Sequence, residues 1–379
     1  KFLKLNFSQP DYFQANTLKN FAMKLPNLSK FCLDLSGNRG IDVKKITHFT
    51  ESLVFQANLT DFDLNLSQVN LSNENLLELI SKIGCLEKRI QHLKLNVCQM
   101  RDLSKTGMEG LAHFLGKLEV LQSLNLDLSQ CDEIEDDDFE KLFTTIKMLK
   151  YLSSFTLSAY GTIKLTQKSI QLLLGQEEDE DISFNISSEA EAEKINPDLN
   201  VKANDQLYGS SSFKQISQLC LKWSVWEDPF EGPKISGSFS GSFKSYPNLF
   251  ALDLSLGLGT NQRIPIEIFT SLERLKRLSK LSLCVYFSGK TSGQIITSLG
   301  HSLKNLPLLY LDLSLHGYRI SDRSAWGSFF QDLGDLTDLI TLSFHLSYCK
   351  GIYQDEWKKL AFSFVKTKCL TSLKLALDS

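Results

Sequence analysis

The sequence lacks several features that define common classes of protein. No apolar run approaches the roughly 20 residues that a membrane-spanning helix needs, which argues against membrane insertion. The eight cysteines form no CxxC pair, a distribution typical of reduced thiols in a cytoplasmic protein rather than of a disulfide framework. The net charge is only −3, so no overall positive field attracts nucleic acid. We expect an intracellular, cytoplasmic protein.

Motifs that carry catalysis or bind cofactors are also missing. No HExxH metal motif, GxSxG nucleophile elbow or GxGxxG dinucleotide loop occurs. Gly289-Lys290-Thr291 has the ending of a phosphate-binding loop, but Cys284 stands where that motif requires its first glycine. None of the six histidines has paired metal spacing, and only His345, expected on the concave face of the sheet, is kept as a candidate ligand. We therefore expect no catalytic site, no metal and no cofactor.

One strand-like segment of alternating apolar residues recurs along the chain. Five copies begin 31 residues apart, at Phe31, Phe62, Leu93, Leu124 and Phe155. Further copies begin at Leu3, Leu252, Leu281, Leu311, Leu342 and Leu373. Alternation of this kind predicts β-strands with one buried face. With two more strands expected at Ile182–Ile186 and Leu219–Trp223, the sequence predicts about 13 repeats of about 31 residues.

Each strand segment is followed by a turn and then by a helical pattern. The turn residues Asn38, Met100, Cys131 and Cys349 are expected to face inward. Apolar residues then recur at spacings of three and four, most clearly at Met108, Leu111, Phe114, Leu115 and Leu118. One strand–helix unit cannot bury its own apolar face, so the units must stack. The sequence predicts an α/β solenoid with a parallel sheet on its concave side and helices on its convex side.

This repeat resembles the leucine-rich repeat family, in particular the ribonuclease-inhibitor-like subclass, in which nearly every repeat carries a helix. The strand ending Leu-Asp-Leu-Ser, at Leu33–Ser36, Leu252–Ser255 and Leu311–Ser314, resembles the large repeat families of ciliated protists. The resemblance implies a horseshoe fold, and it says almost nothing about function.

The middle of the chain interrupts the rhythm. Regular repeats are expected over residues 1–174 and 248–379, and irregular repeats with acidic and Gly/Ser/Pro-rich insertions over 175–247. Residues 175–205 hold ten acids and two lysines, a local charge of −8. Residues 187–212 are expected to be mobile. Trp223, Trp226 and Phe230 either fill the space of a missing helix or form an exposed binding loop.

The leading functional hypothesis is a non-catalytic scaffold that binds a protein partner. Candidate binding residues on the concave face are Asp34, Asp63, Asn65, Asn96 and Asp127. Asp34, Asp63 and Asp127 could receive a basic segment of a partner, and salt would then weaken the contact. The simpler interpretation is that a crowded concave sheet tolerates only small side chains.

Three other functions fit the same pattern. Both ends lack the polar shield that terminal repeats carry, which favours a segment of a longer protein. One alternative is therefore the regulatory or targeting region of a kinase or a ubiquitin ligase. A second alternative is a structural subunit of a cytoskeletal or ciliary assembly. A minor alternative is a GTPase-activating protein of the Ran type, with Arg39 as the residue that stabilises charge.

Overall fold

The computed structural model describes residues 1–7, 27–38, 53, 56–162, 169, 213, 215–224, 243–257, 266–286, 290–291, 293–317, 319–320, 323–349 and 352–378. Trp226, Phe230, Arg39 and the segments 182–186 and 187–212 lie outside this part of the chain.

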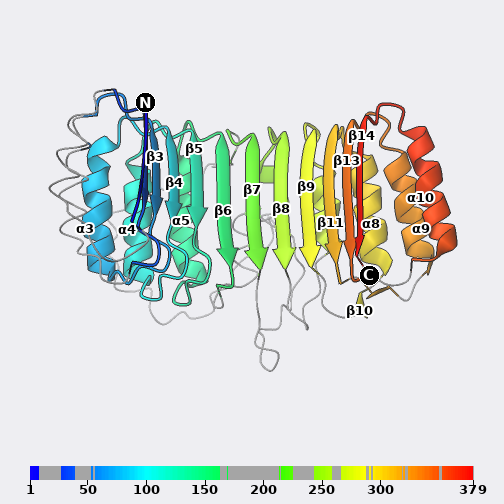
Figure 1. Cartoon of the computed structure of the whole chain (residues 1–379), viewed down its shortest axis with the longest axis horizontal. Helices are drawn as coiled ribbons and strands as arrows, with labels where there is room; N and C mark the ends of the chain where they lie inside the picture. Colours follow the sequence, from blue (N-terminus) through cyan, green and yellow to red (C-terminus); the bar gives the residue numbers. More distant parts are fainter. Residues whose placement is uncertain are drawn as a thin grey trace, which may run out of the picture.

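Twelve strands form one parallel sheet in chain order (Figure 1). They are β1 (Phe2–Asn6), β2 (Lys30–Asp34), β3 (Asp61–Asn65), β4 (His92–Asn96), β5 (Ser123–Asp127), β6 (Ser154–Tyr160), β7 (Gln218–Ser224), β8 (Ala251–Gly257), β9 (Lys280–Tyr286), β11 (Tyr310–His316), β13 (Thr341–Ser347) and β14 (Ser372–Asp378). Two short strands, β10 (Lys290–Thr291) and β12 (Arg319–Ile320), pair separately. The parallel sheet with one strand per repeat confirms the predicted solenoid.

The helices flank the outer side of the curved sheet (Figure 1). They are α3 (Asn73–Ile83), α4 (Lys105–Gly116), α5 (Asp136–Met148), α7 (Ile266–Leu272), α8 (Gly293–Lys304), α9 (Arg323–Gly334) and α10 (Gln354–Lys366), with short 3₁₀ turns η1 (Gly84–Leu86) and η3 (Phe243–Ser245). A sheet inside and helices outside give the horseshoe of a leucine-rich repeat protein, as expected.

The core lies between the sheet and the helices. In β5 the alternate residues Leu124 and Leu126 are 1% and 0% exposed, while Asn125 and Asp127 between them are half-buried on the other face. The predicted helical positions Met108, Leu111, Phe114 and Leu115 are all buried in α4. Period two in the strands and period 3.6 in the helices therefore place apolar side chains on the two surfaces that meet.

Each strand ends in a turn of fixed geometry. A left-handed residue follows the strand in seven described repeats, with φ between 55° and 74°: Gly37, Gln68, Gln99, Gln130, Gly161, Gly317 and Tyr348. The next residue points inward, so Asn38, Met100 and Cys131 are at most 2% exposed, as predicted. The thiols of Cys131 and Cys349 each donate to a carbonyl of the preceding repeat, Val97 and Leu315, at 3.3 Å. Turn side chains thus tie each repeat to the one before it.

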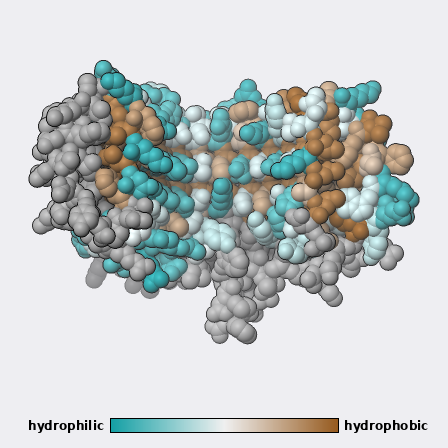
Figure 2. Space-filling view, viewed as in Figure 1, coloured by the Kyte–Doolittle hydropathy of each residue, from teal (hydrophilic) through white to brown (hydrophobic). Residues whose placement is uncertain are grey.

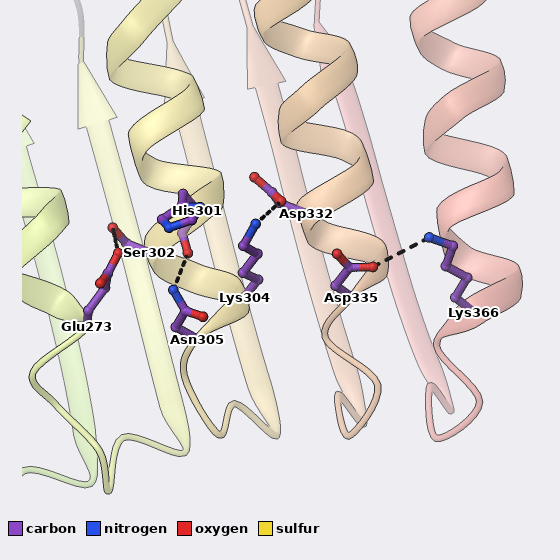
Figure 3. A network of polar contacts seen from close by, with 8 residues as sticks. All are labelled: Glu273, His301, Ser302, Lys304, Asn305, Asp332, Asp335 and Lys366. Atoms are coloured by element: carbon purple, nitrogen blue, oxygen red, sulfur yellow. Dashed lines mark hydrogen bonds and ion pairs between the residues drawn. The ribbon is translucent and has the colours of Figure 1, made fainter.

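Polar contacts link the helices of the last repeats (Figure 3). The ammonium of Lys304 on α8 lies 2.9 Å from Asp332 on α9, and that of Lys366 on α10 lies 3.4 Å from Asp335. The first pair is better shielded from water, with side chains 29% and 10% exposed. Exposed pairs contribute little, so the buried leucines dominate the stability of this region.

The number of strands in the described sheet is one lower than expected, and the difference lies in the irregular middle. β6 pairs directly with β7 over all seven residues, from Ser154–Gln218 to Tyr160–Ser224. This pairing leaves no place between them for a strand at Ile182–Ile186. The described sheet therefore has 12 strands rather than 13, and the chain from β6 to β7 adds no strand between them.

Candidate functional site

Two columns of side chains, with one residue per strand, run along the middle of the concave face. The first column is Lys4, Cys32, Asp63, Lys94, Asn125, Thr156, Cys220, Asp253, Ser282, Asp312, Ser343 and Lys374. The second is Asn6, Asp34, Asn65, Asn96, Asp127, Ser158, Lys222, Ser255, Cys284, Ser314, His345 and Ala376. Figure 2 shows hydrophilic and hydrophobic residues mixed across this face.

The second column closes turns in the N-terminal half of the sheet. The side-chain oxygens of Asp34, Asn65, Asn96 and Asp127 each accept a hydrogen bond from the backbone N–H two residues later, at 2.9–3.1 Å. These strands end after five residues, whereas strands with serine, lysine, cysteine, histidine or alanine at this position continue for seven. Four of the five predicted binding residues therefore have a structural role that the sequence analysis missed.

The predicted acidic strip is also interrupted. Asp34 and Asp127 are separated by Asn65 and Asn96, and three strand spacings of about 4.8 Å put them about 14 Å apart. Asp63, in the first column, lies between Cys32 and the exposed Lys94. Burial, and then Asp63, raises the pKa of the Cys32 thiol to about 11. The three acids are in one region, but cationic and neutral neighbours dilute their charge.

The Leu-Asp-Leu-Ser segments occupy two different registers. Leu33 pairs with Leu64, and this row of partners continues along the sheet to Leu254, so Leu252 aligns with Phe31 instead. Asp34 consequently closes a turn in the second column. Asp253 and Asp312 lie in the first column, in the interior of the face. The predicted strand starts Phe31 and Leu252 already imply this difference, because they put Ser255 rather than Asp253 in register with Asp34.

A hollow of about 510 Å³ lies on the concave face over β6 to β13. Small residues, including Ala251 and Ser282, form its floor, and Asp253, Asp312, Lys280 and Tyr310 add polar and aromatic groups. Asp312 is exposed, and Tyr310 is 44% exposed. The Cys220 thiol donates to the Asp253 carboxylate at 3.5 Å, and burial followed by this carboxylate raises the pKa of Cys220 to about 11.

Aromatic and imidazole rings lie on the same face near the carboxyl ends of strands β9, β11 and β13. His316 stacks on Tyr286 with ring centroids 4.5 Å apart, and His345 meets the edge of His316 at 5.1 Å. Within the described residues, no group of three or more His, Cys, Asp or Glu side chains could hold a metal ion. His345 thus lies on the concave face, as the sequence predicted, in a row of rings.

The predicted aromatic loop is only partly described. Trp223 belongs to β7, while Trp226 and Phe230 lie outside the described residues. The choice between a filled gap and an exposed binding loop therefore lies outside what the structure describes. Elsewhere, Trp326 on α9 is fully buried against Phe329 and Phe330, as expected of a core residue.

The repeat, the parallel sheet and the outer helices define the chain as a leucine-rich repeat solenoid. No protein-family model and no curated protein matches the sequence. No described helix has the length and apolar character required to cross a membrane.

The solved structures that are similar to this chain include the following two. One is the leucine-rich repeat-containing protein LegL7 from Legionella pneumophila, with 13% identity and a TM-score of 0.46 over 97% of both chains. The other belongs to the Toll–Spatzle complex, a hub in Drosophila development and innate immunity. It has 15% identity and a TM-score of 0.31, over 92% of this chain and 42% of that one. At these values neither likeness bears on function.

Proposed function

We propose that this chain is a non-catalytic scaffold that holds a polypeptide partner on its concave face, with the hollow over β6 to β13 as the main contact. The observation that carries the proposal is the hollow itself. It crosses six neighbouring strands on a face that no described helix covers, and its volume of about 510 Å³ suits several inserted side chains.

The lining of the hollow indicates the chemistry of the partner. Asp253 and Asp312 lie two strands apart, Ser282 stands between them, and Asp312 has no ion-pair partner among the described residues. Tyr310 adds an exposed ring, and aromatic side chains contribute strongly to interfaces. A basic or amphipathic segment that places a cation near Asp312 fits these groups, and added salt should weaken its binding.

Photo-crosslinking tests the proposal directly. A benzophenone amino acid replaces Tyr310 in the hollow or, as the control, Met148, which is 66% exposed on α5. Adducts with a partner should form from position 310 and not from position 148. Asp312→Lys should abolish the adduct, whereas the same substitution at the exposed Asp338, in the turn before β13, should not. Equal adducts from both positions would rule out the hollow as the binding site.

The acidic strip of Asp34, Asp63 and Asp127, with Asn65 and Asn96, is a second contact for a basic segment. It is supported by the position of Asp63 on the concave face beside Cys32, where burial and then this carboxylate raise the pKa of the thiol although Lys4 opposes them. Asp63→Lys tests this contact best, because that carboxylate closes no turn. Partner binding that is unchanged by Asp63→Lys would leave the strip as a turn-forming element only.

The finer assignments are supported less directly. The helix that follows most described strands supports the ribonuclease-inhibitor-like subclass. The likeness to repeat families of ciliated protists, a cytoplasmic, cytoskeletal or ciliary location, and a role within a kinase or ubiquitin ligase stay hypotheses. The Ran-type alternative depends on Arg39, which lies outside the described residues.

A further inference from the structure

A row of three glutamines follows the carboxyl ends of β3, β4 and β5. Gln68, Gln99 and Gln130 occupy the same position in consecutive repeats, and all three have left-handed backbones, with φ of 60°, 61° and 57°. The repeats on either side have Gly37 and Gly161 at this position, with φ of 72° and 69°. Glycine adopts this conformation without strain, and glutamine does not.

The fold does not require glutamine here. The backbone N–H groups of Gln68, Gln99 and Gln130 donate to the carbonyls of the next repeat at 2.7–2.9 Å, and the N–H of Gly37 makes the same bond at 2.8 Å. Glycine therefore serves this turn equally well. The side-chain amide of Gln99 donates to that of Gln130, which uses only part of the bonding capacity of the row. The three side chains call for a role beyond the backbone turn.

A second polar row runs beside the glutamines. Asn70, Arg101 and Asp132, each two residues further along the chain, line the same groove, which has a volume of about 740 Å³. Val69, between the two rows, is only 2% exposed, so polar groups provide most of the accessible lining. Arg101 and Asp132 balance in charge. The groove is thus neutral and rich in amides.

We propose that this glutamine groove, lined by Gln68, Gln99, Gln130, Asn70, Arg101 and Asp132, binds an extended segment of polypeptide through its peptide groups. A primary amide donates and accepts hydrogen bonds, as a peptide group does, so the rows and a peptide backbone are complementary. From Gln68 to Gln130 the row spans two strand spacings, about 10 Å, the length of about three extended residues. The neutral lining does not favour the phosphates of a nucleic acid.

This site is independent of the concave hollow. The groove lies at the ends of β3 to β6, whereas the hollow lies over β6 to β13. Substitutions in one should leave the other intact, so either proposal can fail without the other.

Nuclear magnetic resonance with selective ¹⁵N-glutamine labelling tests the groove. The probe is the blocked peptide acetyl-Thr-Ser-Thr-Ser-Thr-amide, whose β-branched residues favour an extended backbone. The side-chain NH₂ signals of Gln68, Gln99 and Gln130 should shift and saturate, while those of the exposed Gln122, before β5, and Gln331 on α9 should not. The same peptide with all five backbone nitrogens methylated and a dimethylamide C-terminus lacks backbone N–H donors and should cause no shift. Absence of a saturable shift up to about 10 mM peptide, or equal shifts with the methylated peptide, would overturn the proposal.

A matched pair of variants separates binding from folding. Gln99→Gly removes the central amide and relieves the left-handed strain, so the melting temperature should stay the same or rise. The peptide affinity measured at Gln68 and Gln130 should fall about three- to tenfold. Gln122→Gly, at the opposite end of β5 from the groove, should leave that affinity unchanged. A Gln99→Gly variant that melts lower and binds the peptide as the wild type does would assign the row to the stacking of repeats and refute the groove.

Discussion

The carboxylate of Asp127 accepts a hydrogen bond from the backbone N–H of Ser129 at 3.0 Å, and β5 ends at Asp127. The side chain satisfies a backbone donor at the point where the chain leaves the ladder of the sheet. Asp34, Asn65 and Asn96 do the same in their own repeats. A concave residue is therefore part of the turn and also part of the surface that a partner would meet.

Asp127→Lys should destabilise the protein by about 1 kcal/mol, because the lysine cannot accept the Ser129 N–H. Asp127→Asn is the control, since asparagine makes the same bond at Asn65 and Asn96. Urea denaturation measures both. Equal stability of the lysine and asparagine variants would show that the turn does not depend on this side chain.

Leu126→Ala should lower the free energy of unfolding by about 2–5 kcal/mol. Leu126 is 0% exposed and lies between Leu95 and Leu157 of the neighbouring strands, so its loss leaves a cavity between three repeats. Asn125→Ala, one residue earlier on the concave face, should change stability far less. If the two variants melted together, the inward register of β5 would be wrong.

The buried leucines could be predicted because they recur at a regular interval along the sequence. A residue such as Leu126 is fixed by its interval, and the same argument placed Met100 and Cys131 in the core. The glutamine row was not predictable from residue type, since Gln68 and Gln99 give no sign of a left-handed backbone. The available signal was positional: Gly37 and Gly161 lie in register with them.

The concave site was predicted only in outline. The sequence identified the face and its columns correctly. Asp34 and Asp253 share a local motif, but the strand intervals put Ser255 rather than Asp253 in register with Asp34, and the strand pairing agrees. The hollow also depends on which strands are neighbours across the irregular middle, and β6 beside β7 could not be read from spacing.

Alkylation by iodoacetamide should follow burial and thiol pKa. Burial, the largest cause in each case, raises the pKa of Cys98 to about 11 and that of Cys131 to about 12. At pH 8 only about one in a thousand thiols with a pKa near 11 is the reactive thiolate. The exposed Cys369 should therefore react first and Cys131 last, as mass spectrometry of digested protein would show.

The pH dependence of alkylation tests whether the pKa values of these thiols are raised. Raising the pH from 8 to 10 should accelerate labelling of Cys98 about a hundredfold, because its pKa lies above this range and its thiolate fraction grows tenfold per pH unit. A rate that levels off near pH 9 would mean that the Cys98 thiol has an ordinary pKa and is not desolvated.

Gly334→Ala should destabilise the protein by about 1–3 kcal/mol, because the added methyl has no room. A Cβ at Gly334 on α9 would lie 2.7 Å from the Cβ and 2.9 Å from the Cα of Ser363 on α10. The backbone atom cannot turn away as a flexible side chain would, so the two helices must separate. Calorimetric melting of the purified variant measures the loss.

Gly84→Ala is the matched control for this substitution. Gly84 has φ −53° and ψ −23°, which alanine adopts freely, and no atom lies within 4 Å of the position that its added methyl group would take. This variant should match the wild type or gain up to about 1 kcal/mol, because alanine restricts the unfolded chain. If Gly334→Ala were equally harmless, α9 and α10 could shift apart without loss, and their close approach at Gly334 would not contribute to stability.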